Sequence, residues 1–171
     1  MLRVLTPALV GSVLLAALST VADYVWFRDI PQHQVSSGMI HGAVVFSALG
    51  SYLGWRKGKV AVGAIGGLLS GTLAALSFYA LAPMGGYGMM IVSWLLLWIM
   101  LAALVGHLDG ALSPARAVGR GVVTSIAAGL GFGVVLFQLY RGWPPAEFPA
   151  VKHFVAWSMA YLPGLYVLLK K

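Results

Sequence analysis

Hydrophobic residues occur along this chain in six long runs, separated by short polar segments. A helix needs about 20 apolar residues to cross the roughly 30 Å hydrocarbon core of a bilayer, and each run is close to that length. The runs predict helices at residues 5–27, 36–55, 60–82, 86–108, 117–140 and 153–169. The expected fold class is therefore all-α: a polytopic membrane protein in which six transmembrane helices form one domain over residues 1–171.

Basic residues are distributed unevenly among the segments that connect these runs. Of the eleven Lys and Arg residues, eight lie at the two termini and in the second and fourth connections, and three lie in the first and fifth. The eight are Arg3, Arg56, Lys57, Lys59, Arg116, Arg120, Lys170 and Lys171; the three are Arg28, Arg141 and Lys152. Cytoplasmic loops carry the excess of Lys and Arg. We therefore predict cytoplasmic termini, in the inner (plasma) membrane of a bacterium.

The composition agrees with this class. Hydrophobic residues make up 60% of the chain and charged residues 9%, against about 25% charged residues in soluble domains. The net charge of +7 does not indicate nucleic acid, because the charges lie in short loops, where they fix topology and meet anionic lipid head groups. Membrane lipids are the expected partners. Since the chain has no cysteine, disulfides and thiolate metal sites are excluded.

Small residues recur at helical spacing in three of the runs. The first stripe is Gly63, Gly67, Gly71 and Ala75, the second is Gly42, Phe46, Gly50 and Gly54, and the third is Ser125, Gly129 and Gly133, with Gly131 beside it. Such stripes let helix backbones approach closely in lipid. We interpret them as packing surfaces within the chain, with a homodimer seam as the alternative. The bulky segment from Trp94 to Trp98 is expected to face lipid or a partner.

Ionisable residues near the membrane are few, and they gather at the predicted outer side. Asp23 lies about one turn before the end of the first run, His41 lies about one turn into the second, and His153 begins the sixth. Trp26 and Glu147 belong to the same boundary. Because ionisable groups in or beside the membrane are costly, each is a candidate for a functional role. We predict these five residues as ligand-binding, with Asp23 as the hydrogen-bond partner of His41.

The same residues leave two chemical alternatives open. His41 and His153, at similar depth on different helices, are the candidates for axial ligands of a haem. Ser36 and Ser37 lie near His41 on one helix, as an enzyme with a hydroxyl nucleophile would need. The sequence has neither the Gly-x-Ser-x-Gly motif nor a His-Glu-x-x-His motif. We therefore predict no catalytic residue and no metal site, and we expect a lipid rather than a haem as the bound molecule.

The expected function is accordingly non-catalytic: the helices hold a lipid or another apolar small molecule between them, and the protein contacts a membrane partner. A second interpretation is the substrate-binding component of a vitamin or small-molecule transporter. In that interpretation Ala8, Ser12 and Ala16 would dock a scaffold subunit. Independent transport has little support, because Pro163-Gly164 is the one predicted helix break and no carboxylate lies at midplane depth.

Three short motifs add a family resemblance. The fourth run ends in Leu108-Asp109, followed by Ser113, Arg116, Gly119 and Gly121; the fifth ends in Phe137-Gln138-Leu139-Tyr140-Arg141-Gly142; and Glu147-Phe148 precedes Trp157 and Leu162-Pro163. In this order the chain resembles the insulin-induced gene (Insig) family of six-helix membrane proteins, which bind sterols and hold sterol-sensing partners. It lacks the paired tryptophans and Pro-Pro of that family's second helix. The resemblance implies a non-catalytic lipid-binding protein, with Asp109 at a partner-facing cytoplasmic turn.

Overall fold

The computed structural model describes residues 2–29, 34–110, 113–139 and 149–170, and all regular structure in these residues is helical. The elements are α1 (Leu2–Asp29), α2 (Gln34–Trp55), α3 (Val60–Gly85), a short 3-10 helix η1 (Gly86–Met89), α4 (Met90–Leu108), α5 (Pro114–Leu139) and α6 (Ala150–Leu169). The all-α class is confirmed, and a helix is present for each of the six hydrophobic runs.

The turn between α3 and α4 differs in detail from the prediction. α3 continues through Pro83 to Gly85, and α4 begins at Met90 instead of residue 86. Gly86 ends α3 with a φ of 57°, in the left-handed region that glycine adopts without steric cost, and its N–H donates to the carbonyl of Ala82. The four residues of η1 then connect the two helices.

Three of the helices in the described residues are long and apolar enough to cross a membrane. They are Leu2–Val25 within α1, Val60–Gly85 and Met90–Leu108. These spans support the assignment of the chain as an integral membrane protein.

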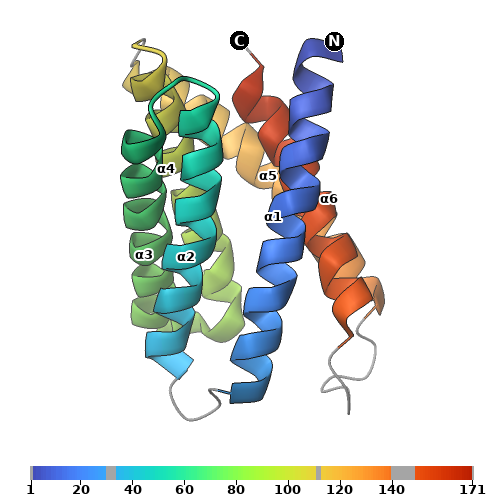
Figure 1. Cartoon of the computed structure of the whole chain (residues 1–171). Helices are drawn as coiled ribbons and strands as arrows, with labels where there is room; N and C mark the ends of the chain where they lie inside the picture. The colour runs from blue at the N-terminus through green and yellow to red at the C-terminus, as the bar shows by residue number, and fades with distance from the viewer. Residues whose placement is uncertain (1, 30–33, 111–112, 140–148, 171) are drawn as a thin grey trace.

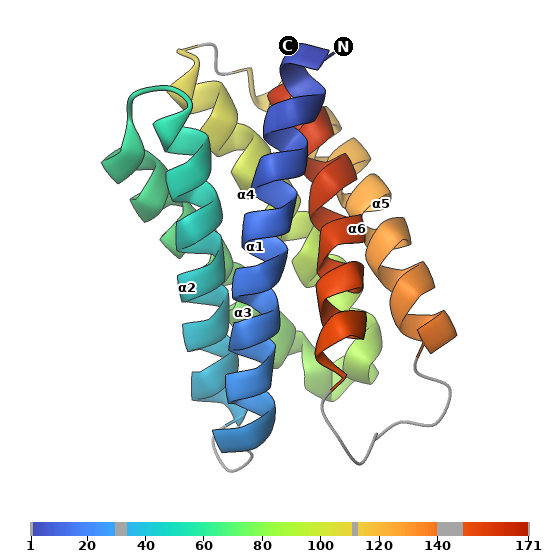
Figure 2. The same cartoon turned by 45° about the vertical axis from the view of Figure 1, so that its right-hand side comes forward.

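The six helices form a closed ring. Each helix packs against the next one in the chain, and α6 returns to pack against α1. α2 with α3 and α1 with α6 make the most extensive contacts, whereas α1 and α2 touch least among sequence neighbours. The two termini lie at one end of the bundle together with the α2–α3 and α4–α5 connections (Figures 1 and 2). Seven of the eight basic residues of the predicted inner side therefore belong to one end, and the eighth, Lys171, lies outside the described residues.

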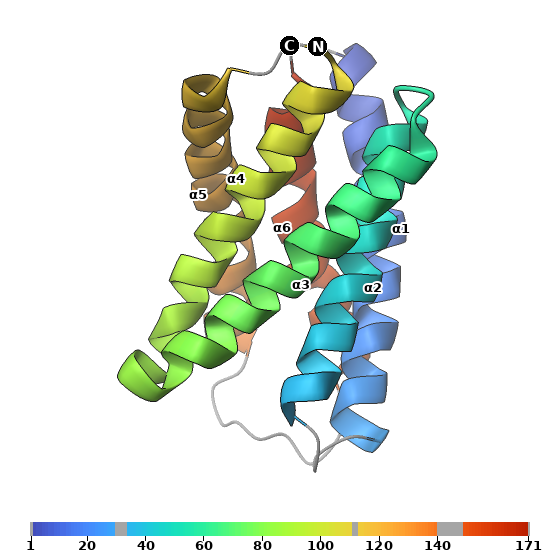
Figure 3. The same ribbon diagram turned by 90° about the vertical axis from the view of Figure 1, so that its left-hand side faces the viewer.

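Glycine stripes join α2 and α3 almost backbone to backbone. A Cβ atom added at Gly67 would lie 1.9 Å from the carbonyl oxygen of Phe46, and one at Gly50 would lie 2.1 Å from that of Gly63. At Gly71 the distance to the Gly42 carbonyl oxygen would be 2.2 Å. The two stripes thus pack against each other within the chain, as the sequence predicts (Figure 3).

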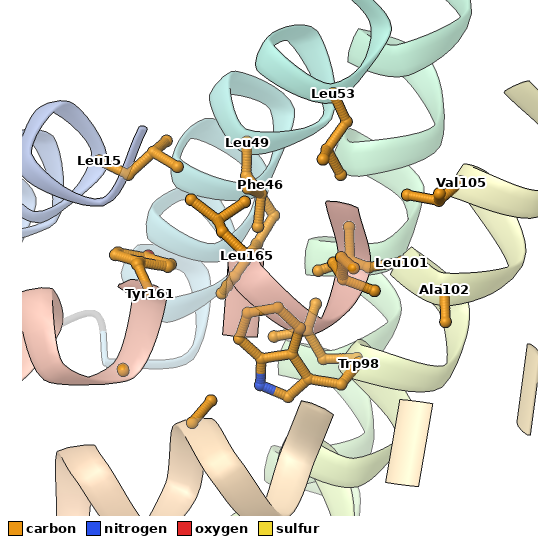
Figure 4. Packing of buried hydrophobic residues seen from close by; sticks show 14 of the residues in the cluster. Leu15, Phe46, Leu49, Leu53, Trp98, Leu101, Ala102, Val105, Tyr161 and Leu165 are labelled. Carbon is orange, nitrogen blue, oxygen red and sulfur yellow. The ribbon is translucent and has the colours of Figure 1, made fainter. Parts of the chain in front are cut away.

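Trp98 occupies the centre of the ring. The expectation that the segment from Trp94 to Trp98 faces lipid or a partner is therefore wrong for Leu97 and Trp98. The Trp98 side chain is fully buried, and Leu97 is 2% exposed. Figure 4 shows the indole beside Leu101 and Leu165. A Cβ atom at Gly164 would lie 2.7 Å from the Trp98 ring. The missing side chain at Gly164 therefore makes the space that the indole fills.

α5 approaches its neighbours through glycines other than those of its predicted stripe. A Cβ atom at Gly131 would lie 2.1 Å from the Met159 carbonyl oxygen on α6, and one at Gly121 would lie 2.4 Å from the Ile99 Cα on α4. Gly129 meets the Trp94 side chain at an ordinary 3.4 Å, and Gly133 faces open space. Only part of the predicted stripe is therefore a packing surface.

The predicted helix break at Pro163-Gly164 is also absent. α6 is one continuous helix from Ala150 to Leu169, with Pro163 inside it. Gly164 is explained by the close contact with Trp98 described above.

Candidate functional site

Asp23 is the centre of a polar cluster at the end of the bundle opposite the termini. Its Oδ2 accepts a hydrogen bond of 2.6 Å from Trp157 Nε1. His153 Nδ1 lies 2.7 Å from the same oxygen. His153 and Trp157 are four residues apart on α6, so they share one helix face and reach α1 together. Two of the close contacts between α1 and α6 are thus hydrogen bonds to a single carboxylate.

His41 approaches the same carboxylate from α2. Its Nε2 lies 3.4 Å from Asp23 Oδ1, and its ring centroid lies 6.4 Å from that of Trp157. The side chains of His41, Asp23 and His153 are 19%, 15% and 14% exposed, respectively. We call Asp23, His41, His153 and Trp157 the outer polar site. It is mostly buried, with a small part of each of its ionisable side chains exposed.

The hydrogen-bonding roles within the outer polar site follow from the chemistry of its groups. An ionised carboxylate accepts hydrogen bonds and donates none. Trp157 donates through its indole N–H, and His153 Nδ1 must carry its proton when it bonds to the ionised carboxylate. The Asp23 carboxylate therefore fixes the tautomer and the orientation of the His153 ring.

An aromatic group closes the inner side of this site. Trp157 stacks on Tyr161, with ring centroids 5.4 Å apart and an angle of 17° between the ring planes. Phe132 packs on Trp157 at 4.7 Å, and Trp94 packs on Phe132 at 5.8 Å. The Tyr161 hydroxyl shares a 2.9 Å hydrogen bond with the Ser19 hydroxyl. Side chains thus fill the ring between the outer polar site and Trp98.

Three of the five predicted ligand-binding residues meet in this cluster: Asp23, His41 and His153. Glu147 lies outside the described residues, and so does the side chain of Trp26. Trp157 was not among the residues predicted for the site. Its position four residues after His153 was the available signal, because the two side chains lie on one face of a helix.

The predicted partner-binding residue, Asp109, lies at the other end of the bundle. Its carboxylate forms an ion pair with Lys57 in the α2–α3 turn. Lys59 of the same turn donates a 3.0 Å hydrogen bond to the carbonyl of Leu108, at the end of α4. A cation at the carbonyl end of a helix is favourable. Asp109 therefore helps to join the α2–α3 turn to α4.

The geometry bears on the haem alternative, which involves His41 and His153. Among the described residues, no group of three or more His, Cys, Asp or Glu side chains is arranged to hold a metal ion. His41 Nε2 and His153 Nδ1 both point at the Asp23 carboxylate, which occupies the space between them. Two axial haem ligands would instead need to face each other across an open slot. The observed donor set does not fit a haem.

The stripe on α1 that a transporter scaffold would use is buried. Ala8 and Ala16 are fully buried, and Ser12 is 1% exposed. A Cβ atom at the neighbouring Gly11 would lie 2.7 Å from the Tyr52 ring on α2. This stripe packs inside the chain and presents no free surface to a second subunit.

Comparison with known proteins gives no further assignment. No family model, no curated protein and no solved structure matched this chain. The resemblance to the Insig family therefore stays a prediction that rests on the three sequence motifs.

Proposed function

We propose that all six helices span the membrane, with the termini in the cytoplasm. α2, α5 and α6 contain 22, 26 and 20 residues, which at about 1.5 Å per residue is enough to cross the hydrocarbon core. They close a ring with α1, α3 and α4, which contain the three helices long and apolar enough to cross a membrane. The concentration of Lys and Arg at the end that holds the termini supports the orientation.

We propose that this protein is a non-catalytic receptor for an amphipathic lipid, whose polar head group binds the outer polar site. The observation that carries the proposal is the convergence of Asp23, His41, His153 and Trp157 from three helices at a partly exposed position. Ionisable groups at this depth are costly without a function. The exposed apolar residue Val44 lies three residues after His41 on the same face of α2, where a lipid chain can lie.

The arrangement favours a head group that donates a hydrogen bond. When His41 turns Nε2 with its proton toward Asp23, Nδ1 is left as an acceptor. No described residue forms a hydrogen bond with this Nδ1. A hydroxyl group can donate to it, whereas a phosphate or carboxylate would be repelled by the Asp23 charge. The ligand class we propose is therefore a lipid alcohol.

The proposal can be tested with probes that share one hydrocarbon chain. Purified protein in detergent is incubated with oleyl alcohol, methyl oleate or oleate, and retained molecules are counted by native mass spectrometry. We expect oleyl alcohol to be retained in preference to both other probes. The variant His41→Leu should lose this preference by about tenfold, the effect of one lost hydrogen bond of about 1.4 kcal/mol.

His107→Leu is the matched control, because His107 is an exposed histidine near the opposite end of the bundle. It should retain oleyl alcohol as the unchanged protein does. Equal retention of the three probes, or an equal loss in both histidine variants, would contradict a site at His41. Release of a chemically altered product would replace the proposed receptor with an enzyme.

A further inference from the structure

A second surface feature lies near the cytoplasmic end of the bundle, away from the outer polar site. It is a depression of about 360 Å³ between α5 and α6. We call it the inner groove; its lining residues are Gly119, Arg120, Val123, Tyr166, Val167 and Lys170. Both charged residues of the inner groove are basic, and its remaining surface is largely apolar.

Arg120 is held in place before any ligand arrives. Its Nη2 donates a 2.7 Å hydrogen bond to the backbone carbonyl of Lys170, which follows the last turn of α6. The guanidinium group has five N–H donors in a planar fork, so most of them remain for other acceptors. Since the side chain is already ordered, less conformational entropy is lost when it binds a second group.

The wall of the inner groove suits a hydrocarbon chain. Val123 is 55% exposed, and Val167 faces it across the groove from α6. Gly119 lines the groove without a side chain, and a Cβ atom there would meet nothing within 4 Å. Tyr166 also lines the groove. The inner groove therefore combines cationic donors with an apolar surface. An amphipathic ligand with an anionic head group and a hydrocarbon chain would match this combination.

We propose that the inner groove binds an anionic phospholipid of the cytoplasmic leaflet, with its phosphate on Arg120 and Lys170. Arginine binds phosphate through paired charge-assisted hydrogen bonds. Basic pockets between helices on the cytoplasmic side are suited to anionic head groups. Asp109, the acidic residue described at this end, is already paired with Lys57 and does not line the groove. This site is independent of the lipid alcohol proposed for the outer polar site.

Native mass spectrometry of detergent-purified protein tests the proposal with two phospholipids of identical chains, phosphatidylglycerol and phosphatidylcholine. We expect at least one phosphatidylglycerol to remain bound preferentially. Arg120→Gln should weaken its retention about tenfold, because the charge-assisted contact with the phosphate is lost. Gly119→Leu should weaken it as well, since the leucine side chain would occupy the groove.

Two matched variants control for general effects. Arg56→Gln removes one charge at the same end of the bundle, and Gly133→Leu adds a leucine to α5 where a Cβ also meets nothing within 4 Å. Both should retain phosphatidylglycerol normally, and circular dichroism should show all four variants folded. The proposal would be overturned by equal retention of the two lipids, by unchanged binding in Arg120→Gln and Gly119→Leu, or by an equal loss in Arg56→Gln. Displacement of the lipid by soluble glycerol 3-phosphate would assign the groove to free phosphate esters instead.

Discussion

α2 takes part in two interfaces of opposite character. Against α3 it presents Gly42, Gly50 and Gly54, and the backbones of the two helices are in direct contact. Against α1 it makes far fewer contacts, and His41 lies 3.4 Å from Asp23 there. The helices α2 and α3 pack closely because glycines leave no side chains between them, whereas polar side chains connect α2 to α1.

The contrast supports the proposal that a rigid bundle can also accommodate a ligand. α2 with α3 and α1 with α6 form two tightly packed pairs. The contact between α1 and α2, which joins the two pairs, is much smaller than the contact within either pair. A backbone contact cannot widen without losing many van der Waals contacts at once, whereas a side chain can rotate. We therefore expect a ligand at the outer polar site to be accommodated between the pairs, while each pair stays intact.

The largest expected effect comes from breaking the glycine interface. Gly67→Leu places a side chain where even a Cβ atom would lie 1.9 Å from the Phe46 carbonyl oxygen, so α2 and α3 must separate. We expect a loss of more than about 3 kcal/mol in the free energy of unfolding, or no folded protein at all. Thermal unfolding in detergent, followed by circular dichroism, measures it.

Gly85→Leu is the control for that substitution. Its Cβ atom would meet the terminal methyl group of Met89 at 2.5 Å, and this flexible side chain can move aside. We expect a much smaller change in the unfolding temperature. Equal unfolding temperatures for the two leucine variants would show that the glycine stripe has no special role.

The two interfaces also differ in how far sequence reasoning could predict them. The spacing of Gly63, Gly67 and Gly71 predicts a packing surface directly, because glycine at every fourth residue leaves one helix face without side chains. Asp23, His41 and His153 could be grouped by depth alone, since each lies near the same end of its helix. Trp98 could not be placed in this way, because its space is made by Gly164 on another helix. Apolar helices in lipid carry no periodic pattern that separates buried from lipid-facing positions.

The next largest effect concerns the carboxylate of the outer polar site. Asp23→Ala removes the acceptor shared by His153 and Trp157 and leaves their donors without it. We expect a loss of about 2 kcal/mol in the free energy of unfolding. Asp23→Asn keeps one acceptor oxygen and should lose less. An unchanged unfolding temperature in Asp23→Ala would mean that the hydrogen bonds between α1 and α6 do not stabilise this pair.

Trp157→Phe sharpens the same point with a smaller change. A phenyl ring can keep the stacking on Tyr161 and the contact with Phe132, while the indole N–H is lost. We expect a loss of about 1 kcal/mol. The double variant with Asp23→Ala should lose less free energy of unfolding than the sum of the losses in the two single variants. Both substitutions remove the same hydrogen bond. Additive losses would indicate that Trp157 stabilises the protein through packing alone.

The smallest expected effect on stability is that of His41→Leu, and it separates binding from folding at the interface between α1 and α2. The 3.4 Å contact with Asp23 is long, and 19% of the His41 side chain is exposed. A contact of this length is weak, and leucine replaces most of the apolar contact that the ring makes. We expect the free energy of unfolding to change by less than about 0.5 kcal/mol. Thermal unfolding of His41→Leu and the unchanged protein, both without added lipid, measures the difference. A loss as large as that of Asp23→Ala would mean that His41 joins α2 to α1 as firmly as His153 joins α6 to α1, and the contrast between the two interfaces of α2 would fail.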